Sequence, residues 1–146
     1  MCGIFGYVGT RTATPLLLEG LRTLEYRGYD SAGIFVPGYG AVKAVGPIDE
    51  LAKKITTTIP GTTGIAHTRW ATHGANTQEN CQPILMPTGV FSFLCHNGMV
   101  QQVGTGWGGE TRSDTVILAG KLKDAKTPLD LINLFTAISG KNAFVV

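Results

Sequence analysis

Short hydrophobic runs separated by turn-forming residues organise the first third of the chain. The run at 2–8 is rich in β-forming residues and broken by glycines, which predicts a buried strand at the very start of the sequence. After Thr14-Pro15, leucines at helical spacing predict an amphipathic helix that ends near Arg27-Gly28. Two further β-like runs, 32–36 and 41–45, flank a turn that contains Pro and Gly, and we expect them to form a hairpin.

The rest of the chain alternates between short β-like and helical patterns. The expected elements are a brief helix at 47–54, strands at 64–68 and 90–95, helices at 114–122 and 128–138, and a strand beginning at 144. A polar, irregular stretch at 70–87 lies between two of these strands. Because binding residues are concentrated in such connections, we expect the functional residues of this half to lie there.

Composition and charge exclude several classes of protein. With 146 residues, 43% hydrophobic and 15% charged, the chain is expected to form one globular domain, 1–146. A net charge of +2, with no run of Lys or Arg, argues against nucleic acid or an anionic membrane as a partner. No apolar run approaches the roughly 20 residues that span a bilayer. There is no recognisable signal peptide either, so we expect a cytoplasmic location.

The cysteines are the first candidates for chemistry. Cys2, Cys81 and Cys95 are odd in number and lack the spacing of zinc ligands, so neither a disulfide framework nor a metal site is expected. Cys2 precedes a glycine, and methionine aminopeptidases remove Met1 when the next side chain is small. The freed α-amine, with a pKa of about 7.7 to 8.0, could deprotonate a thiol of pKa about 8.5. Taken alone, however, a small apolar cysteine that begins a strand is the more common case.

Five sequence blocks in a fixed order change that balance. They lie at 1–9, 24–33, 67–74, 96–98 and 113–115. Together they resemble the class II glutamine amidotransferases, and the block at 24–33 is most similar to the version in glutamine:fructose-6-phosphate amidotransferases. The resemblance spans residues 1 to about 120. Five ordered blocks form a strong signal where any single block would be weak.

The resemblance implies both a fold and a reaction. The fold is the α+β, four-layer αββα sandwich of the N-terminal-nucleophile hydrolases, here shortened at the C-terminus. The reaction is hydrolysis of the glutamine side-chain amide by Cys2, through a thioester, to glutamate and ammonia, with no cofactor or metal. The implied partners are L-glutamine and an ammonia-accepting synthase domain or separate subunit, such as one that aminates a sugar phosphate in amino sugar biosynthesis. A homo-oligomer stays open.

Asn97 and Gly98 are the expected oxyanion-stabilising pair. Attack on an amide builds negative charge on its oxygen, and a side-chain amide beside a flexible backbone N–H can stabilise that charge. The resemblance assigns this role to the same two residues. A plain hairpin turn is the alternative, because Asn-Gly is a strong turn signal.

Recognition of glutamine requires a cation for its carboxylate and an acid for its ammonium group. Arg69 and Asp114 fit these roles, and the resemblance assigns them in the same way. It also places Trp70, Thr72 and His73 in a loop that closes over the substrate. The alternatives are that Arg69 lies on the surface and that Asp114 only caps a helix.

Two further hypotheses concern Arg27 and the remaining cysteines. Arg27 can stabilise the end of a helix through its charge, and the resemblance gives the matching arginine a supporting role around the nucleophile. A rival mechanism would pair Cys81 or Cys95 with His73 or His96. It is disfavoured because Cys95 and His96 are adjacent on an expected strand and therefore point to opposite faces.

The chain also departs from the family pattern. After Asn97-Gly98 it continues through 99–103 into a short glycine-rich loop at 104–109, where relatives have an Asn-containing segment and a helix. That loop lacks the strand, helix and acidic residue of a nucleotide site. Near Cys81-Gln82-Pro83 the usual histidines are replaced. The alternatives are therefore a glutamine sensor with impaired catalysis, or a glutaminase subunit that serves a non-sugar acceptor.

Overall fold

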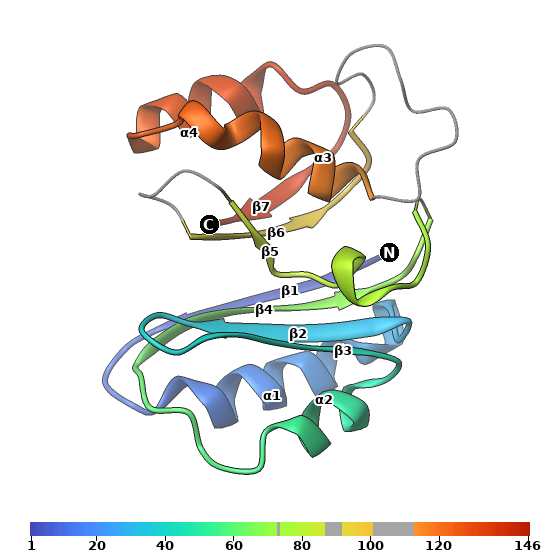
Figure 1. Cartoon of the computed structure of the whole chain (residues 1–146), viewed down its shortest axis with the longest axis vertical. Helices are drawn as coiled ribbons and strands as arrows, with labels where there is room; N and C mark the ends of the chain where they lie inside the picture. Colours follow the sequence, from blue (N-terminus) through green and yellow to red (C-terminus); the bar gives the residue numbers. More distant parts are fainter. Residues whose placement is uncertain (73, 87–91, 101–112) are drawn as a thin grey trace.

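Two antiparallel β-sheets lie face to face, each covered on its outer side by two helices (Figure 1). The computed structural model describes residues 1–72, 74–86, 92–100 and 113–146. The layers run helix, sheet, sheet, helix, which confirms the αββα architecture expected from the sequence.

The first sheet is built from residues 3–69. Its strands, in the order β1-β4-β2-β3, are β1 (Gly3–Val8), β4 (Thr63–Arg69), β2 (Ser31–Val36) and β3 (Gly40–Val45). The second sheet, in the order β5-β6-β7, contains β5 (Ile84–Leu85), β6 (Phe93–Asn97) and β7 (Ala143–Val145). Every strand pair among the described residues is antiparallel, as expected for a sandwich with segregated helices.

The helices follow from local sequence signals. On the first sheet lie α1 (Ala13–Leu24), continued by the 3-10 turn η1 (Glu25–Arg27), and α2 (Ile48–Lys54); on the second lie α3 (Asp114–Lys121) with η3 (Leu122–Asp124), and α4 (Pro128–Thr136). The side chain of Ser113 caps α3 by accepting the Val116 N–H, and Thr127 and Asp130 form a capping box at α4. A further turn, η2 (Gln78–Asn80), precedes β5.

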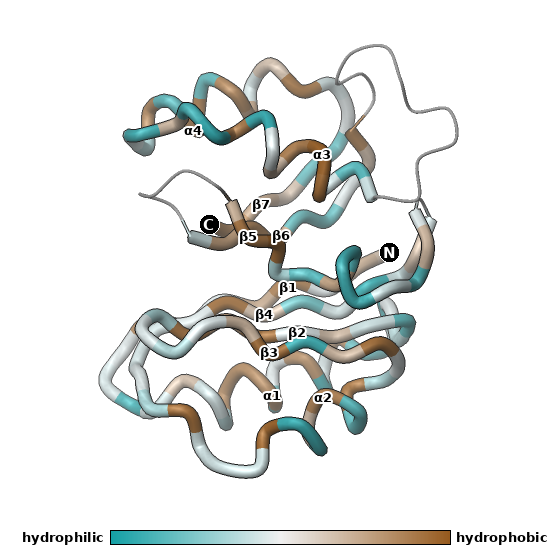
Figure 2. Tube along the Cα trace, in the orientation of Figure 1, coloured by the Kyte–Doolittle hydropathy of each residue, from teal (hydrophilic) through white to brown (hydrophobic). Residues whose placement is uncertain are grey.

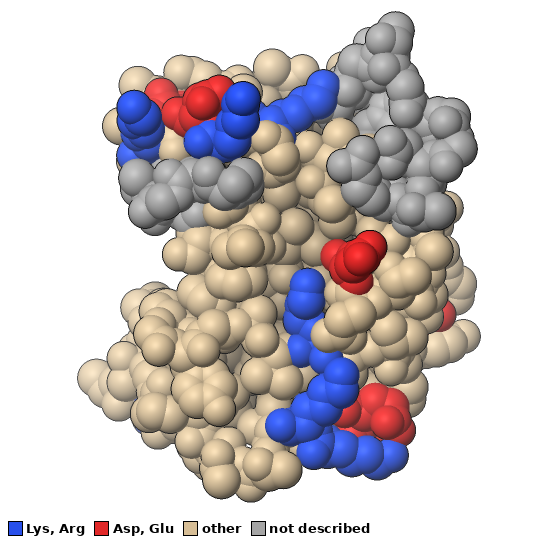
Figure 3. Space-filling model, viewed as in Figure 1, with Lys and Arg blue, Asp and Glu red and all other residues tan. Residues whose placement is uncertain are grey.

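Each sheet has its own hydrophobic core against its helices. Beneath the first sheet, Ala13, Leu17 and Leu21 of α1 recur every four residues and are fully buried. Around the second sheet, Leu94 and Leu122 are equally buried among the residues of α3 and α4. Figure 2 shows hydrophobic positions on the helices and strands of both halves. On the face in Figure 3, acidic and basic side chains lie in mixed groups near both ends of the molecule.

Alternation along β1 sets the direction of the residue that precedes it. Phe5 faces α1, since a methyl group added at Gly20 would meet its ring. Gly6 faces the other sheet, where an added methyl group would lie 4.0 Å from Val145. Because side chains alternate with a period of two, Cys2 belongs to the side that faces the second sheet.

Most elements agree with the sequence expectations, and two differences stand out. β5 was not expected, because two residues carry no periodicity. The strand expected at 90–95 is described from Phe93 and extends to Asn97, since pairing of Asn97 with Ala143 continues the ladder. The glycine-rich loop at 104–109 lies outside the described residues. None of the helices in the described part is long and apolar enough to cross a membrane.

Gly33 tests how closely the sheets approach each other. A methyl group added there would collide with the Gln82 carbonyl oxygen, so Gly33→Ala should destabilise the fold by about 1–3 kcal/mol. Gly120→Ala is the matched control, because nothing lies within 4 Å of the added carbon. This exposed helical position should gain roughly 0.5–1 kcal/mol. Urea denaturation measures both values; equal effects in the two variants would contradict the close packing at Gly33.

Candidate active site

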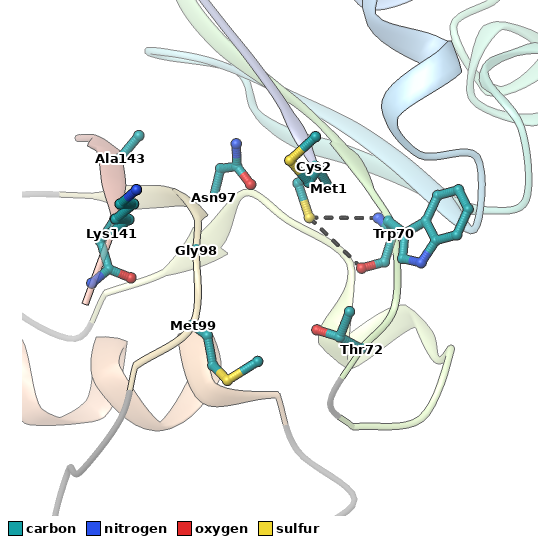
Figure 4. Close-up of a pocket in the computed structure, with 10 residues that line it drawn as sticks. Met1, Cys2, Trp70, Thr72, Asn97, Gly98, Met99, Lys141 and Ala143 are labelled. Carbon is teal, nitrogen blue, oxygen red and sulfur yellow. Dashed lines mark hydrogen bonds between the residues drawn. The ribbon is translucent and has the colours of Figure 1, made fainter. Parts of the chain in front are cut away.

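A cavity of about 520 Å³ opens beside the N-terminus (Figure 4). Residues 1–2, 97–99 and 141–143 line it together with Trp70 and Thr72. A narrow second cavity of about 20 Å³ shares Cys2, Trp70, Thr72 and Gly98 with the first, and it is also lined by Arg69 and Asp114. Cys2 therefore lies at the junction of the large cavity and the narrow inner cavity.

The thiol of Cys2 is held against the chain that leaves β4. Its Sγ accepts the Trp70 N–H at 3.5 Å and lies 3.8 Å from the Trp70 carbonyl oxygen (Figure 4). Burial raises the pKa of this thiol, while the Trp70 N–H, the N-terminal amine and the charge of Arg69 oppose the rise. A nucleophilic role would therefore require a nearby base.

Among the described residues, neither of the other two cysteines has a histidine partner of the kind considered from the sequence. Cys95 is fully buried on the face of β6 opposite to His96, and burial raises the pKa of its thiol. The Cys81 thiol donates to the Thr77 carbonyl at 3.2 Å. His73, the remaining candidate partner, lies outside the described residues.

Asn97 and Gly98 stand where β6 ends, and both line the large cavity. Gly98 has φ +153°, a conformation that a side chain would strain. In the described part of the chain the next element after β6 is α3, and β6 pairs with β5 and β7. The two residues therefore form a bend at the end of β6, the Asn97-Gly98 turn, and not the tight hairpin that was the alternative interpretation.

Arg69 and Asp114 meet at the narrow inner cavity from different elements. Arg69, the last residue of β4, is 3% exposed, so the surface alternative is wrong. Its guanidinium donates to the carbonyl oxygens of Ala75 at 3.0 Å and Gly74 at 3.3 Å. The Asp114 carboxylate accepts the Val100 N–H at 3.1 Å. Capping is not its role, because the N-cap of α3 is the preceding serine.

Of the other residues named from the resemblance, Trp70 and Thr72 line the cavities and Arg27 does not. Trp70 and Thr72 line both cavities, and the Trp70 ring packs edge-on against Tyr29 with 5.8 Å between centroids. His73 lies outside the described residues. Arg27 is not among the residues that line either cavity; its Nε donates to the Tyr26 hydroxyl at 3.0 Å.

A buried polar cluster behind Asn97 and Gly98 escaped the sequence interpretation. Gln82 accepts the His96 N–H at 2.6 Å and donates to the Thr115 hydroxyl at 3.1 Å. The His96 ring then lies between Thr115 and Asn142. His96 and Thr115 belong to the matched blocks, but nothing in the pattern marked Asn142. In the described part of the chain, no cluster of His, Cys, Asp or Glu is suited to hold a metal ion.

His67 provides a buried, neutral support between the sheets. Its Nε2 lies 3.1 Å from the His96 carbonyl oxygen, which can only accept, so Nε2 carries the proton. Burial is the main cause that lowers the pKa of His67 to about 3. The ring is therefore uncharged throughout the neutral pH range.

Comparison with known proteins places this geometry among glutamine-dependent enzymes. Glutamine–fructose-6-phosphate aminotransferase (isomerizing) of Streptococcus pyogenes serotype M6 is 42% identical over the whole chain, which covers 27% of that relative. The same enzyme of serotype M3 is 53% identical over 104 residues, covering 69% of this chain and 17% of the relative. The chain thus spans between about a sixth and a quarter of these curated relatives. No protein-family model matches it.

Solved structures give the same result. One is described as the allosteric regulatory enzyme of purine biosynthesis, and it superposes with a TM-score of 0.76 at 29% identity. Another is glutamine phosphoribosylpyrophosphate amidotransferase from B. subtilis, complexed with ADP and GMP, with a TM-score of 0.76 at 28% identity. Each match covers 99% of this chain and 34% of the other.

The buried imidazole of His67 makes stability depend on pH. Below about pH 6.5 the unfolded chain gains a proton on this histidine, while the folded protein does not until about pH 3. The free energy of unfolding should therefore fall by about 2 kcal/mol from this group between pH 7.5 and pH 5. His67→Gln keeps an N–H donor but does not titrate. In urea denaturation at a series of pH values, it should reduce the slope of the unfolding free energy against pH by the equivalent of about one proton. An unchanged slope would refute the assignment.

Proposed function

Because the chain belongs to the class II glutamine amidotransferases, we propose that it hydrolyses the side-chain amide of glutamine with Cys2 as the nucleophile. One observation carries the proposal above all. Cys2 shares a single cavity with the Asn97-Gly98 turn, although β1 and β6 belong to different sheets. A cavity of this size is in the usual range for small-molecule sites.

The chemistry begins once Met1 is removed and Cys2 has a free α-amine. The amine takes the thiol proton, and the thiolate attacks the side-chain carbonyl carbon of glutamine. The resulting oxyanion accepts hydrogen bonds from the N–H groups of the Asn97 side-chain amide and the Gly98 backbone. As the C–N bond breaks, the ammonium returns its proton to the leaving nitrogen, which departs as ammonia. Water then cleaves the thioester to glutamate and regenerates the thiol.

The electrostatics of Cys2 support the need for this built-in base. Burial raises the pKa of the thiol, so little thiolate would exist near neutral pH without proton transfer. An α-amine titrates close to neutrality and is attached to the same residue. Because the nucleophile and the base belong to one residue, no second group has to be brought into position for the proton transfer.

Arg69 and Asp114 would hold the other end of glutamine. In the structure their groups bind the carbonyl oxygens of Gly74 and Ala75 and the N–H of Val100. The substrate α-carboxylate would replace those carbonyl oxygens on Arg69, and the α-ammonium would bind Asp114. The inner cavity of about 20 Å³ holds little more than one water, so it must widen as glutamine enters. Trp70, Thr72 and His73 would then cover the substrate.

The acceptor of ammonia would lie outside this domain. The relatives named above act, by their names, on fructose 6-phosphate and on phosphoribosylpyrophosphate. Since the block at 24–33 resembles the sugar branch, we propose a sugar phosphate as acceptor, bound by another domain or chain. A single domain over 1–146, a cytoplasmic location, a homo-oligomer and a supporting role for Arg27 belong to the same proposal.

Removal of the nucleophile tests the reaction directly. Mass spectrometry should show a polypeptide that begins at Cys2, and the purified protein should release ammonia from glutamine. Cys2→Ala should abolish that release because no thioester can form, while Cys81→Ala, which alters a thiol outside both cavities, should retain it. A retained Met1, or full activity in Cys2→Ala, would overturn the proposal. Glutamine binding by calorimetry without turnover would favour the sensor alternative.

Arg69→Lys tests the orientation of glutamine. The lysine keeps the charge but loses the paired N–H geometry, so kcat/KM for glutamine should fall about 10- to 100-fold. With 4-aminobutanamide, which lacks the α-carboxylate, variant and original protein should have equal kcat/KM values. Thermal melting controls for the lost bonds to Gly74 and Ala75. An equal loss on both substrates would contradict a role in carboxylate binding.

A further inference from the structure

Asn142 lies between the candidate oxyanion turn and the buried cluster behind it. It immediately precedes β7, lines the large cavity, and places Oδ1 at 2.9 Å from His96 Nε2. Its Nδ2 points to the Ser139 carbonyl oxygen at 3.4 Å, which agrees with this orientation of the amide. None of the five matched sequence blocks contains this residue, so the resemblance assigns it no role.

The neighbours of His96 determine which ring nitrogen carries the proton. An amide oxygen can only accept, so His96 Nε2 donates to Asn142. On the other side, the Thr115 oxygen receives the Gln82 amide N–H at 3.1 Å and directs its own proton to His96 Nδ1 at 3.1 Å. The result is a directed chain of donors from Gln82 through Thr115 and His96 to Asn142.

Among the described residues, the Asp114 carboxylate is the charged group in contact with this ring. Its Oδ2 lies 4.0 Å from His96 Nδ1, and its Oδ1 is 3.4 Å from the Thr115 hydroxyl, longer than the contact from Thr115 to His96. The carboxylate already accepts the backbone N–H groups of Val100 and Thr115. Asp114 is therefore already engaged by backbone groups, and the bonds from Gln82 through Thr115 and His96 to Asn142 form beside it.

Gly98 rests directly on the His96–Asn142 pair. A methyl group added to Gly98 would collide with Asn142 Oδ1, and it would also lie 2.9 Å from His96 Nε2 and 2.7 Å from the Lys141 carbonyl oxygen. Because Gly98 has no side chain, its backbone can lie close to the His96–Asn142 hydrogen bond. Movement of the Asn142 side chain would move the backbone that carries the Gly98 N–H.

We propose that Asn142 is a positioning residue, which holds the Asn97-Gly98 turn in place through its bond to His96 and its contact with Gly98. This inference rests on the proposed function, because it assigns the turn to stabilisation of the oxyanion. Donors of this kind must be held within about 0.5 Å of the productive geometry, and supporting residues usually provide that precision. Asn142 acts on the transition state through the turn, so its loss lowers kcat more than it changes KM.

The experiment replaces the amide by a side chain of similar size. Asn142→Leu should lower kcat for glutamine about 10-fold with KM within about twofold, less than the 100- to 1,000-fold loss of a direct oxyanion donor. Alkylation of Cys2 by iodoacetamide should be unchanged, because that reaction forms no oxyanion. Asn133→Leu, the same change at an exposed position of α4, is the matched control and should retain full kcat.

A spectroscopic readout separates this inference from the proposed function. In the original protein, ¹⁵N NMR should show His96 as the Nε2–H tautomer, and Asn142→Leu should shift it towards a mixture of tautomers. Asn142→Ala adds no atoms and is measured alongside in case leucine prevents folding. Unchanged kcat and an unchanged His96 signal in a folded variant would overturn the positioning role. If the original protein itself releases no ammonia, the proposed function fails, and the NMR signal alone decides whether Asn142 controls His96.

Discussion

Antiparallel pairing of β1 with β4 is the constraint on which the site depends. The register joins Gly3 to Thr68, so Cys2 lies beside the chain as it leaves β4 through Arg69 and Trp70. A shift of one residue would turn Cys2 towards α1 and away from the second sheet. The bond from the Trp70 N–H to Cys2 Sγ follows from the same register. One strand pair thus positions the thiol and the arginine expected to bind glutamine.

The second sheet completes the site through polar groups that the first sheet cannot provide. β6 brings Asn97 and Gly98 to the large cavity, and His96 belongs to a buried hydrogen-bond cluster that reaches the narrow inner cavity. His67 joins the sheets with a neutral ring, because burial lowers its pKa far below neutrality. The His67 imidazole between the sheets therefore acts as a fixed hydrogen-bonding group rather than as a charge.

The departures from the family pattern acquire a physical meaning in this arrangement. Near Cys81-Gln82-Pro83 the histidines of the family pattern are replaced. Here the Gln82 side chain binds both the His96 backbone and Thr115. The match to the serotype M6 relative extends over 162 positions for 146 residues of this chain, so the chain lacks segments that the relative has. Residues 141–143 line the cavity, and a region that the sequence marked only as the start of a strand contributes to the site.

The amino-acid sequence predicted most of the secondary structure and, through the resemblance, the family and its candidate site residues. Hydrophobic periodicity, Pro at helix starts and Gly in turns are local signals, and they predicted nearly every helix and strand. Five ordered blocks identified the family and named Cys2, Arg69, Asn97, Gly98 and Asp114 together. These residues can be recognised without coordinates because their types are demanded by the reaction itself.

The folded structure shows which of these groups are in contact. It places Arg27 against Tyr26 and outside the lining of both cavities, makes Ser113 the N-cap of α3, and brings Asn142 to His96 from 46 residues away. No local pattern encodes the contact between Asn142 and His96, because the two residues come together only when β6 and β7 pair. A hydrogen bond between distant segments depends on register, twist and close approach, and those are properties of the folded chain.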